Sequence, residues 1–338
     1  MKRTILFPAM TALFLCACGG SKQTSGFGDP VELRAESIAI NEIIKPIGWV
    51  EADGKAVIQS DGTDTVYYVY SLPDFRYMYA GGTKGEGPEE LGSPYMLGKT
   101  PSMKTFWIVD WSKGMLTDFQ AGPDSLKALV RFEPAGEDDP ALMVNDSVAV
   151  YEGGYNLDNL CWIKLVKPHT GEVLDSVLTR AVIEVQKGDG WMSVNMKNVP
   201  AYISDGKTLV VKYEYTDRVE FYDISDGKFT LKKAVGDPRT LEQLRTEDFW
   251  KKTQGKYYEG FVADRDHVYI VEYDYMQEEK SPRQILSSAV LMYDWDGNPV
   301  RKYMLDKPVD ALLVYKDKMF CFNTEEDFEQ VYAYSLDS

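Results

Sequence analysis

The chain has 338 residues, of which 44% are hydrophobic and 13% aromatic. This composition supplies a large core and excludes wholesale disorder. The formal net charge of −16 repels phosphate backbones, so we expect no nucleic acid among the partners.

The first residues have the features of an export signal. Lys2 and Arg3 form a basic start, and Thr4–Leu15 is apolar but too short to cross a bilayer as a mature helix. This pattern predicts a signal peptide over residues 1–17. We find no later stretch of the sequence that is long and apolar enough to predict a transmembrane helix.

A candidate lipid attachment site follows the apolar stretch. The sequence Leu15-Cys16-Ala17-Cys18 resembles a bacterial lipobox, in which a small residue precedes the cysteine that is acylated. We expect lipid attachment at Cys18, because Ala17 precedes it whereas bulky Leu15 precedes Cys16. The alternative is an ordinary secretory signal with accidental cysteines. Residues 18–30 are expected to form a flexible tether.

The expected location is the bacterial cell envelope, with the N-terminal acyl chains as the contact with the membrane. Several acyl chains on one terminus anchor a protein without a transmembrane helix. Lipoproteins exported to the cell surface in some bacterial groups carry an acidic run after the cysteine, and residues 19–23 contain none. This favours the outer membrane facing the periplasm, with surface exposure left open.

The rest of the sequence repeats one pattern, in which an apolar, aromatic-rich strand ends beside a cluster of turn residues. The pattern returns at intervals of roughly 50 residues, which is typical of a radial array of stacked units. Its six copies end at Tyr70–Asp74, Asp118–Gly122, Val166–Gly171, Tyr222–Gly227, Tyr293–Gly297 and Tyr334–Asp337. Six copies predict six units, and they favour a single domain over residues 31–338.

Within each unit the expected strands are short, and Asp-Gly pairs such as Asp53-Gly54 supply the hairpin turns. The clearest strands are Thr65–Tyr70, Thr105–Asp110, Leu209–Tyr215, His267–Tyr273, Val290–Tyr293 and Met319–Asn323. Helical crossovers, which a parallel sheet would need, are almost absent. The predicted fold is therefore all-β, a six-bladed β-propeller of four-stranded antiparallel blades.

The N-terminal strand is expected to close the ring. The sequence stops just after the sixth copy, so the last blade lacks an outer strand. Val31–Ile40 is strand-like and precedes the first full copy. Pairing it into the last blade would remove the exposed edges that otherwise promote aggregation.

One interval between copies is longer than the others. Gly227 and Gly297 are 70 residues apart, which predicts an insertion. Within it, Thr240–Gln254 follows Pro238 and precedes Gly255, a pattern that indicates a helix with a glycine stop.

Two further segments carry a family resemblance. The first is a glycine-rich stretch after the first copy, of the form Gly-x-Gly-Pro-x-Glu followed by an aliphatic residue. The matching residues are Gly85, Gly87, Pro88, Glu90 and Leu91, and later Tyr257–Phe261 with His267–Val271. Together with the lipobox they resemble the TolB-like six-bladed β-propeller lipoproteins of Bacteroidetes. The resemblance implies a secreted, lipid-anchored propeller of mostly unassigned activity, and it transfers no catalytic residue.

We expect no metal and no cofactor. His169 and His267 are the two histidines, and they are too far apart in the sequence for ligand spacing. Asp294–Asn298 resembles the start of a calcium loop, but a hairpin turn explains it better. The segment 81–91 resembles a phosphate loop, but its glutamates would repel phosphate.

The cysteines of the predicted propeller, Cys161 and Cys321, lie in the third and sixth copies. Units that far apart around a ring do not touch. We therefore expect two buried thiols and not a disulfide.

Aromatic and acidic residues are the remaining candidates for a site. Trp107, Trp111, Trp191 and Trp295 could stack on sugars, although such residues pack more often between blades. Propeller enzymes can bring acids from several inner strands to the central channel. Among 53 acidic residues the sequence selects none, so catalytic residues stay unknown.

The leading hypothesis is a monomeric binding or scaffolding module of the cell envelope, for a protein, peptide or glycan. The alternative is a carboxylate-dependent hydrolase or lyase that acts on glycans or peptides in the central channel. A third hypothesis is a purely structural envelope protein. Three or more carboxylates at the channel mouth would favour the enzyme, and an aromatic or apolar mouth would favour binding.

Overall fold

The computed structural model describes residues 26–98, 104–156, 160–188, 191–247, 252–278, 283–326 and 328–336, with residues 184–188 and 191–195 as backbone alone. The predicted signal peptide, Cys16 and the lipid attachment site Cys18 lie outside the described residues. So does the side chain of Trp191. Within the described residues, no helix is long and apolar enough to cross a membrane.

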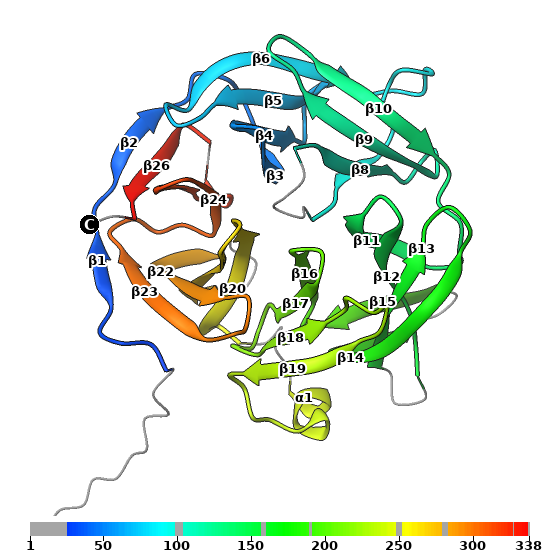
Figure 1. Ribbon diagram of the computed structural model, residues 1–338. Coiled ribbons are helices and arrows are strands. Elements are labelled where there is room, and N and C mark those ends of the chain that lie inside the picture. Colours follow the sequence, from blue (N-terminus) through cyan, green and yellow to red (C-terminus); the bar gives the residue numbers. More distant parts are fainter. Residues whose placement is uncertain are drawn as a thin grey trace, which may run out of the picture.

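Six sheets stand around a central axis, as Figure 1 shows. From the axis outwards, blade 1 contains β3 (Pro46–Ala52), β4 (Lys55–Ser60), β5 (Thr65–Ser71) and β6 (Arg76–Thr83). Blade 2 contains β7 (Pro94–Met96), β8 (Phe106–Asp110), β9 (Met115–Ala121) and β10 (Leu126–Phe132). Blade 3 contains β11 (Asp139–Asn145), β12 (Val148–Tyr155), β13 (Leu160–Lys167), β14 (Glu172–Gly188) and β15 (Trp191–Lys197).

The second half of the ring continues this order. Blade 4 contains β16 (Pro200–Ser204), β17 (Thr208–Tyr213), β18 (Val219–Asp223) and β19 (Thr230–Val235); blade 5 contains β20 (Gln254–Ala263), β21 (His267–Met276), β22 (Gln284–Asp294), β23 (Pro299–Leu305) and β1 (Val31–Leu33); blade 6 contains β24 (Ala311–Tyr315), β25 (Lys318–Phe322), β26 (Gln330–Ser335) and β2 (Glu36–Ala39). The predicted six-bladed propeller is confirmed.

The repeated sequence pattern has one structural meaning. All six copies end at the third strand of a blade, on β5, β9, β13, β18, β22 or β26. In blades 1 to 5 the turn residues then lead into the fourth strand. The Asp-Gly turns also form as expected: Asp53 and Gly54 have φ of 50° and 77°, the positive values that a two-residue hairpin turn requires.

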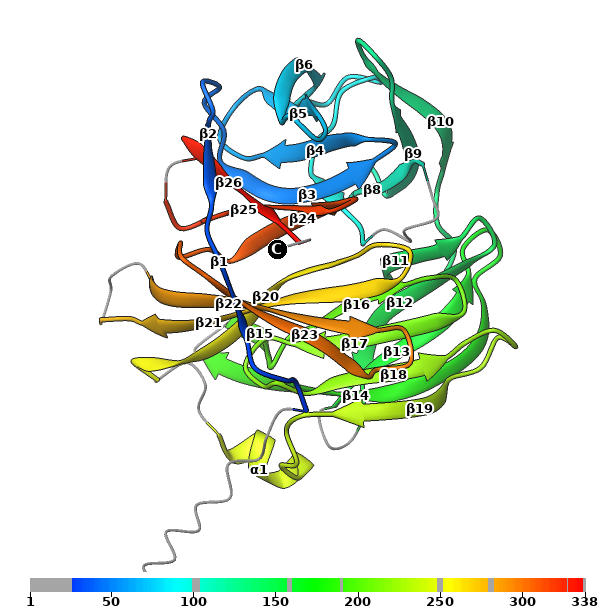
Figure 2. The same cartoon turned by 60° about the vertical axis from the view of Figure 1, so that its left-hand side comes forward.

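The N-terminal segment closes the ring, as predicted, but it forms two strands instead of one. β2 pairs antiparallel with β26 of blade 6, while β1 pairs in parallel with β23 of blade 5. Between them, the backbone N–H of Ala35 donates to Asp306 Oδ1 at 3.0 Å, which turns the chain from one blade to the next. Figure 2 shows this segment crossing the outside of blades 5 and 6.

The predicted insertion lies between blades 4 and 5, but its helix is shorter than expected. α1 spans only Leu241–Thr246 and begins with a capping box, in which Thr240 and Gln243 bond each other's backbone N–H. The prediction of a helix up to Gln254 was wrong, because Gln254 already pairs with Met276 in the sheet. Gly255 accordingly lies in β20 and does not end a helix.

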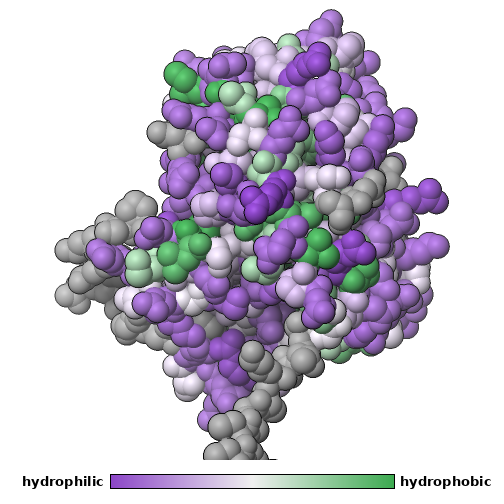
Figure 3. All heavy atoms as spheres, turned by 90° about the vertical axis from the view of Figure 1, so that its left-hand side faces the viewer, coloured by the Kyte–Doolittle hydropathy of each residue, from purple (hydrophilic) through white to green (hydrophobic). Residues whose placement is uncertain are grey.

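The core lies between neighbouring blades. Phe75 of blade 1 packs against Phe320 of blade 6 with ring centroids 5.4 Å apart, and both rings are buried. Cys161 and Cys321 are buried free thiols in blades 3 and 6, as predicted. On the side of the ring that carries β1 and β2, hydrophobic residues form only small groups in a mostly hydrophilic surface (Figure 3).

Candidate functional site

The largest described cavity, of about 500 Å³, lies where the first strands of five blades meet around the axis. We call it the mouth cavity. Its walls come from β3, β7, β11, β16 and β20, with side chains added from the second strands β12 and β17. Figure 1 shows these first strands surrounding the centre of the ring.

Irregularities in three of these strands coincide with the cavity. The register shifts at Ile47 in β3, at Ala141 in β11 and at Glu259-Gly260 in β20, and all four residues line the mouth cavity. A β-bulge redirects side chains and is common beside functional sites. The bulge in β20 therefore accounts for the direction of Glu259 towards the axis.

Gly260 allows blades 5 and 6 to approach closely beside the cavity. Its backbone N–H donates to the Asp310 carbonyl at 2.8 Å. A Cβ at this position would lie only 2.7 Å from Leu312 Cδ2, 2.7 Å from Val271 Cγ2 and 2.8 Å from the Asp310 oxygen. Glycine is therefore required here because every other side chain would collide.

One wall of the mouth cavity is apolar and aromatic. It comes from blades 1 and 2 and includes Ile47, Tyr95 and Trp111, which are 46%, 53% and 43% exposed. Trp49 and Phe261 lie at the floor of the cavity. Exposed aromatic side chains of this kind, surrounded by a concave wall, are typical of a ligand pocket.

The opposite wall is acidic and comes from blades 3, 4 and 5. Asp139 stands on β11, Glu152 on β12, Glu214 just after β17 and Glu259 on β20. All four carboxylates line the cavity. Burial raises the pKa of Glu152 and of Asp139 above their ordinary values. The charge of Asp139 raises the pKa of Glu152 further, and the charge of Asp138 does the same for Asp139.

Glu259 is held by a chain of contacts within blade 5. Tyr273 Oη donates to Glu259 Oε2 at 2.9 Å, and Arg283 Nη1 donates to Tyr273 Oη at 2.9 Å. The Arg283 guanidinium also lies 4.1 Å from the centroid of the Tyr257 ring. Burial, followed by repulsion from Asp310, raises the pKa of Glu259 to about 7.

A tyrosine hydroxyl also holds Glu152, because Tyr202 donates to it. Burial, followed by the charge of Glu214, raises the pKa of Tyr257. Tyr95 lines the same cavity as Glu152 and Glu214. The aromatic wall and the acidic wall therefore share one space.

Lys212 carries a positive charge into the acidic wall. Its side chain is 4% exposed, and Nζ donates to the Tyr258 carbonyl at 2.6 Å. Burial lowers the pKa of Lys212, while Glu214 and Glu259 oppose this shift. Among the described residues that line the mouth cavity, it is the one cation.

Beyond the mouth cavity the channel narrows. A pocket of about 80 Å³ shares Trp49, Tyr202 and Phe261 with it, and continues between apolar residues such as Leu313 and Val314 of blade 6.

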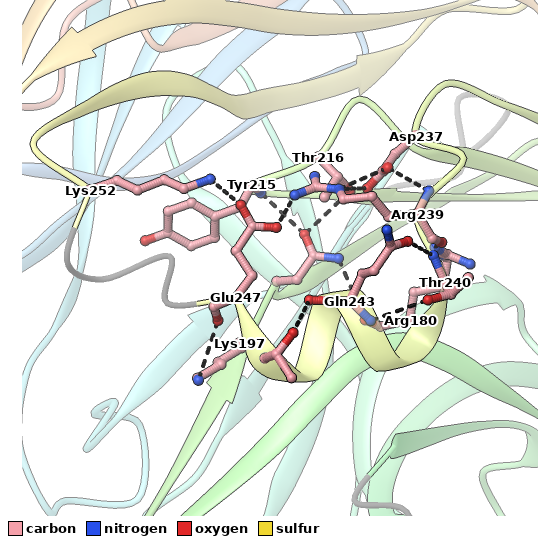
Figure 4. A network of polar contacts seen from close by, with 12 residues as sticks. Arg180, Lys197, Tyr215, Thr216, Asp237, Arg239, Thr240, Gln243, Glu247 and Lys252 are labelled. Carbon is pink, nitrogen blue, oxygen red and sulfur yellow. Dashed lines mark hydrogen bonds and ion pairs between the residues drawn. The ribbon is translucent and has the colours of Figure 1, made fainter.

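A second cavity, of about 380 Å³, lies between blades 4 and 5 beside α1, and we call it the α1 cavity. Its cations already have carboxylate partners. Arg239 Nε lies 2.8 Å from Asp237 Oδ2, and both Arg239 and Lys252 pair with Glu247. Figure 4 shows Arg239 and Lys252 meeting at Glu247, with Arg180 of blade 3 reaching the same insertion.

The tryptophans that the sequence analysis named as candidates occupy different environments in the structure. Trp107 is buried between blades, as packing predicts. Trp295 packs against the cluster between blades 4 and 5 and donates to the Arg265 carbonyl at 3.1 Å. Trp111 lines the mouth cavity.

The segment that resembles a calcium loop and the histidine His169 both have other roles in the structure. Asp294 Oδ1 accepts bonds from the backbone N–H groups of Asp296 and Asn298 at 3.0 and 2.7 Å, which is a hairpin turn. The His169 ring packs on Phe132 with centroids 4.0 Å apart. Within the described part of the chain, no three His, Cys, Asp or Glu side chains are grouped to hold a metal ion.

The glycine-rich loop connects blades 1 and 2. The backbone N–H of Gly87 donates to Glu90 Oε2 at 2.7 Å, and a Cβ on Gly85 would lie 2.1 Å from that oxygen. Lys113 Nζ donates to the carbonyls of Gly87 and Glu90, both at 2.6 Å. Glu90 thus takes the backbone donor that a phosphate would need, and the glycines make room for it.

The sequence did not select Glu152, Lys212, Glu214 or Glu259. A signal was present for two of them, because Glu152-Gly153 and Glu259-Gly260 interrupt otherwise apolar strands. A glycine inside a strand indicates a bulge. An acidic residue at such a bulge is a candidate for a redirected side chain.

Comparison with known proteins supports the fold. The model of the "TolB-like 6-blade propeller-like" family matches residues 35–317. No curated protein matches the sequence. A Bacteroides fragilis crystal structure named "putative exported protein" is 10% identical, with a TM-score of 0.48, over 90% of this chain and 99% of that one.

BamB from Moraxella catarrhalis is also 10% identical, with a TM-score of 0.37, over 90% of this chain and 99% of that one. Likenesses at this level carry nothing about function. The family match, in contrast, spans most of the chain and agrees with the six blades. The chain belongs to the TolB-like six-bladed propeller family.

Proposed function

We propose that the protein is a binding module of the cell envelope, and that it seats its ligand in the mouth cavity. The observation that carries this proposal is the pairing of exposed Tyr95 and Trp111 with four carboxylates around a cavity of about 500 Å³. A volume of this size accommodates a small molecule or a few side chains of a peptide. Membership of the TolB-like family is consistent with an envelope or periplasmic location.

The ligand can be identified by differential retention. The full-length chain, purified in detergent, is incubated with an envelope extract, and retained compounds are identified by mass spectrometry. Trp111→Ala removes part of the aromatic wall and should reduce retention by about tenfold or more. Leu231→Ala is the matched control, because Leu231 is 51% exposed on β19, away from the cavity. Equal retention by both variants and the wild type would contradict the proposal.

The same experiment separates binding from catalysis. A ligand recovered unchanged supports the binding module. A ligand recovered in cleaved form supports the alternative, a carboxylate-dependent hydrolase or lyase. In that case Glu152→Gln and Glu259→Gln would identify which acid takes part.

We also propose that Cys18 anchors the protein to the outer membrane, on the periplasmic side. The support is the lipobox-like sequence before Cys18. Labelled palmitate should be incorporated into the wild type and into Cys16→Ala, and not into Cys18→Ala. Incorporation into Cys18→Ala at the wild-type level would refute the assignment.

A further inference from the structure

The acids of the mouth cavity outnumber its cations. Four carboxylates, from Asp139, Glu152, Glu214 and Glu259, face a single ammonium on Lys212 among the described lining residues. With every group ionised, this wall has a formal charge of −3. A ligand that enters the cavity displaces water from these groups, and uncompensated charges are costly to desolvate.

Lys212 lies near the acids but forms no close ion pair with them. Its Nζ donates to the Tyr258 carbonyl at 2.6 Å, and no ion pair within 4.0 Å joins it to Glu214 or Glu259. The ammonium is directed by the backbone of blade 5 instead. The acids therefore keep most of their capacity to pair with a charge from outside the protein.

The acids also keep acceptor positions. A carboxylate has about four lone-pair sites. Glu152 and Glu259 each receive one hydrogen bond from a tyrosine, Tyr202 and Tyr273. A partner that fills the remaining sites must donate several N–H bonds, which a guanidinium or an ammonium does.

The opposite wall suits the rest of such a ligand. Tyr95 and Trp111 present exposed rings, and Ile47 adds an apolar surface beside them. A cation over an aromatic face within about 6 Å is attracted by the ring, and its apolar stem can pack on the same wall. Tyr95 and the four acids line one cavity, so one ligand can contact both walls.

We propose that the mouth cavity binds a cationic nitrogen group, a guanidinium or a primary amine, that is carried on an apolar body. This inference rests on the proposed function of the cavity. A neutral glycan would leave the acidic wall without compensation, and an anion would be repelled by it. The net charge of −16 would add long-range attraction for the same class of ligand.

The cation can come from a basic side chain of a peptide or from a small amine that is attached to an aromatic ring. Matched probes distinguish these sources. N-acetyl-Phe-Arg-amide is compared with N-acetyl-Phe-citrulline-amide, which has nearly the same shape without the charge. Tyramine is compared with N-acetyltyramine for the same reason. Binding to the full-length chain is measured by calorimetry.

The charged member of at least one pair should bind about tenfold more tightly than its neutral partner. Glu214→Gln and Glu152→Gln should each remove most of that difference. Glu32→Gln is the control, because it removes one negative charge from exposed β1, away from the cavity. Melting curves of all variants show whether each one is folded.

Two results would overturn the inference. In the first, the neutral and charged members bind equally and both lose affinity in Trp111→Ala; the cavity then binds ligands, and the proposed function stands, but charge does not select them. In the second, the charged probes do not bind at all while the envelope ligand is retained in the experiment above. If neither probes nor extract give a ligand that depends on Trp111, both the inference and the proposed function fail.

Discussion

The mouth cavity and the α1 cavity are both polar and comparable in size, about 500 and 380 Å³, yet their charges are arranged in opposite ways. In the α1 cavity, Arg239 and Lys252 already meet Glu247, and Lys256 meets Glu272 at 3.1 Å. In the mouth cavity, four acids line one wall together with a single described cation, Lys212. Charge that is paired internally holds a fold together, whereas charge in surplus is available to a ligand.

The largest effect should come from breaking the pairing in the α1 cavity. Arg239→Met leaves Asp237, which is only 5% exposed, without its charge partner, and should lower the free energy of unfolding by about 3 kcal/mol. Lys252→Met removes a more exposed cation from Glu247, which also pairs with Arg239, and should cost less than about 1 kcal/mol. Urea unfolding measures both. If the two variants lost the same free energy of unfolding, the buried pair of Arg239 and Asp237 would contribute no more to stability than the exposed pair of Lys252 and Glu247.

A smaller effect should distinguish two glycines of β20, one at each cavity. Gly260→Ala forces a Cβ to within 2.8 Å of Leu312, Val271 and the Asp310 carbonyl, and should cost about 2 kcal/mol. Gly255→Ala meets only the Tyr275 ring, at 3.3 Å, which can move aside, so its cost should stay below about 1 kcal/mol. Thermal unfolding compares them. Similar melting temperatures for the two variants would contradict this prediction, because they would mean that blades 5 and 6 can move apart at Gly260 without losing stability.

The smallest effect should be a change in pH dependence at the mouth. The pKa of Glu259 is raised to about 7, so the folded chain holds this proton more tightly than the unfolded chain. That contribution to stability is complete below the ordinary pKa of a glutamic acid and is lost as the pH rises through about 7. Asp310, with a pKa raised to about 6, acts in the same direction.

Glu259→Gln cannot titrate, so its stability relative to the wild type should increase as the pH rises from about 5 to about 8. Denaturant unfolding at both pH values measures this gain. The groups that face Glu259 are Lys212, Glu214, Asp310 and Tyr273, and they are unchanged in the variant. Glu32→Gln is the control for loss of charge alone. A parallel pH profile of wild type and Glu259→Gln would contradict a raised pKa at this position.

The architecture could be predicted from the sequence because it depends on local rules that repeat. Each turn after a third strand needs the same residue types, so Asp226-Gly227 and Asp296-Gly297 identify equivalent positions. The closing strand followed from the missing outer strand of blade 6. These features require no knowledge of distant contacts.

The parts that could not be predicted depend on tertiary contacts. β1 pairs with β23 of blade 5, and Ala35 between β1 and β2 donates to Asp306; both contacts are distant in the sequence, and no local pattern shows them. α1 ends early because β20 gains more from pairing with β21. The cavity acids come from three blades, so their convergence appears only when the ring closes. Trp111 was among the candidates, but its sequence neighbours did not distinguish it from buried Trp107.

The pairing of β2 with β26 has a consequence for how the molecule folds. Glu36 lies opposite Ala333, so the two partners come from opposite ends of the described chain. Contacts between such distant residues form slowly, because a long loop must close first. Blades 1 to 4 can stack as soon as their own strands exist, but blade 6 keeps an open edge until β2 arrives. A chain shortened before Gln330 would therefore retain most of its blades and still expose a strand edge to other chains, which makes aggregation the expected outcome of truncation.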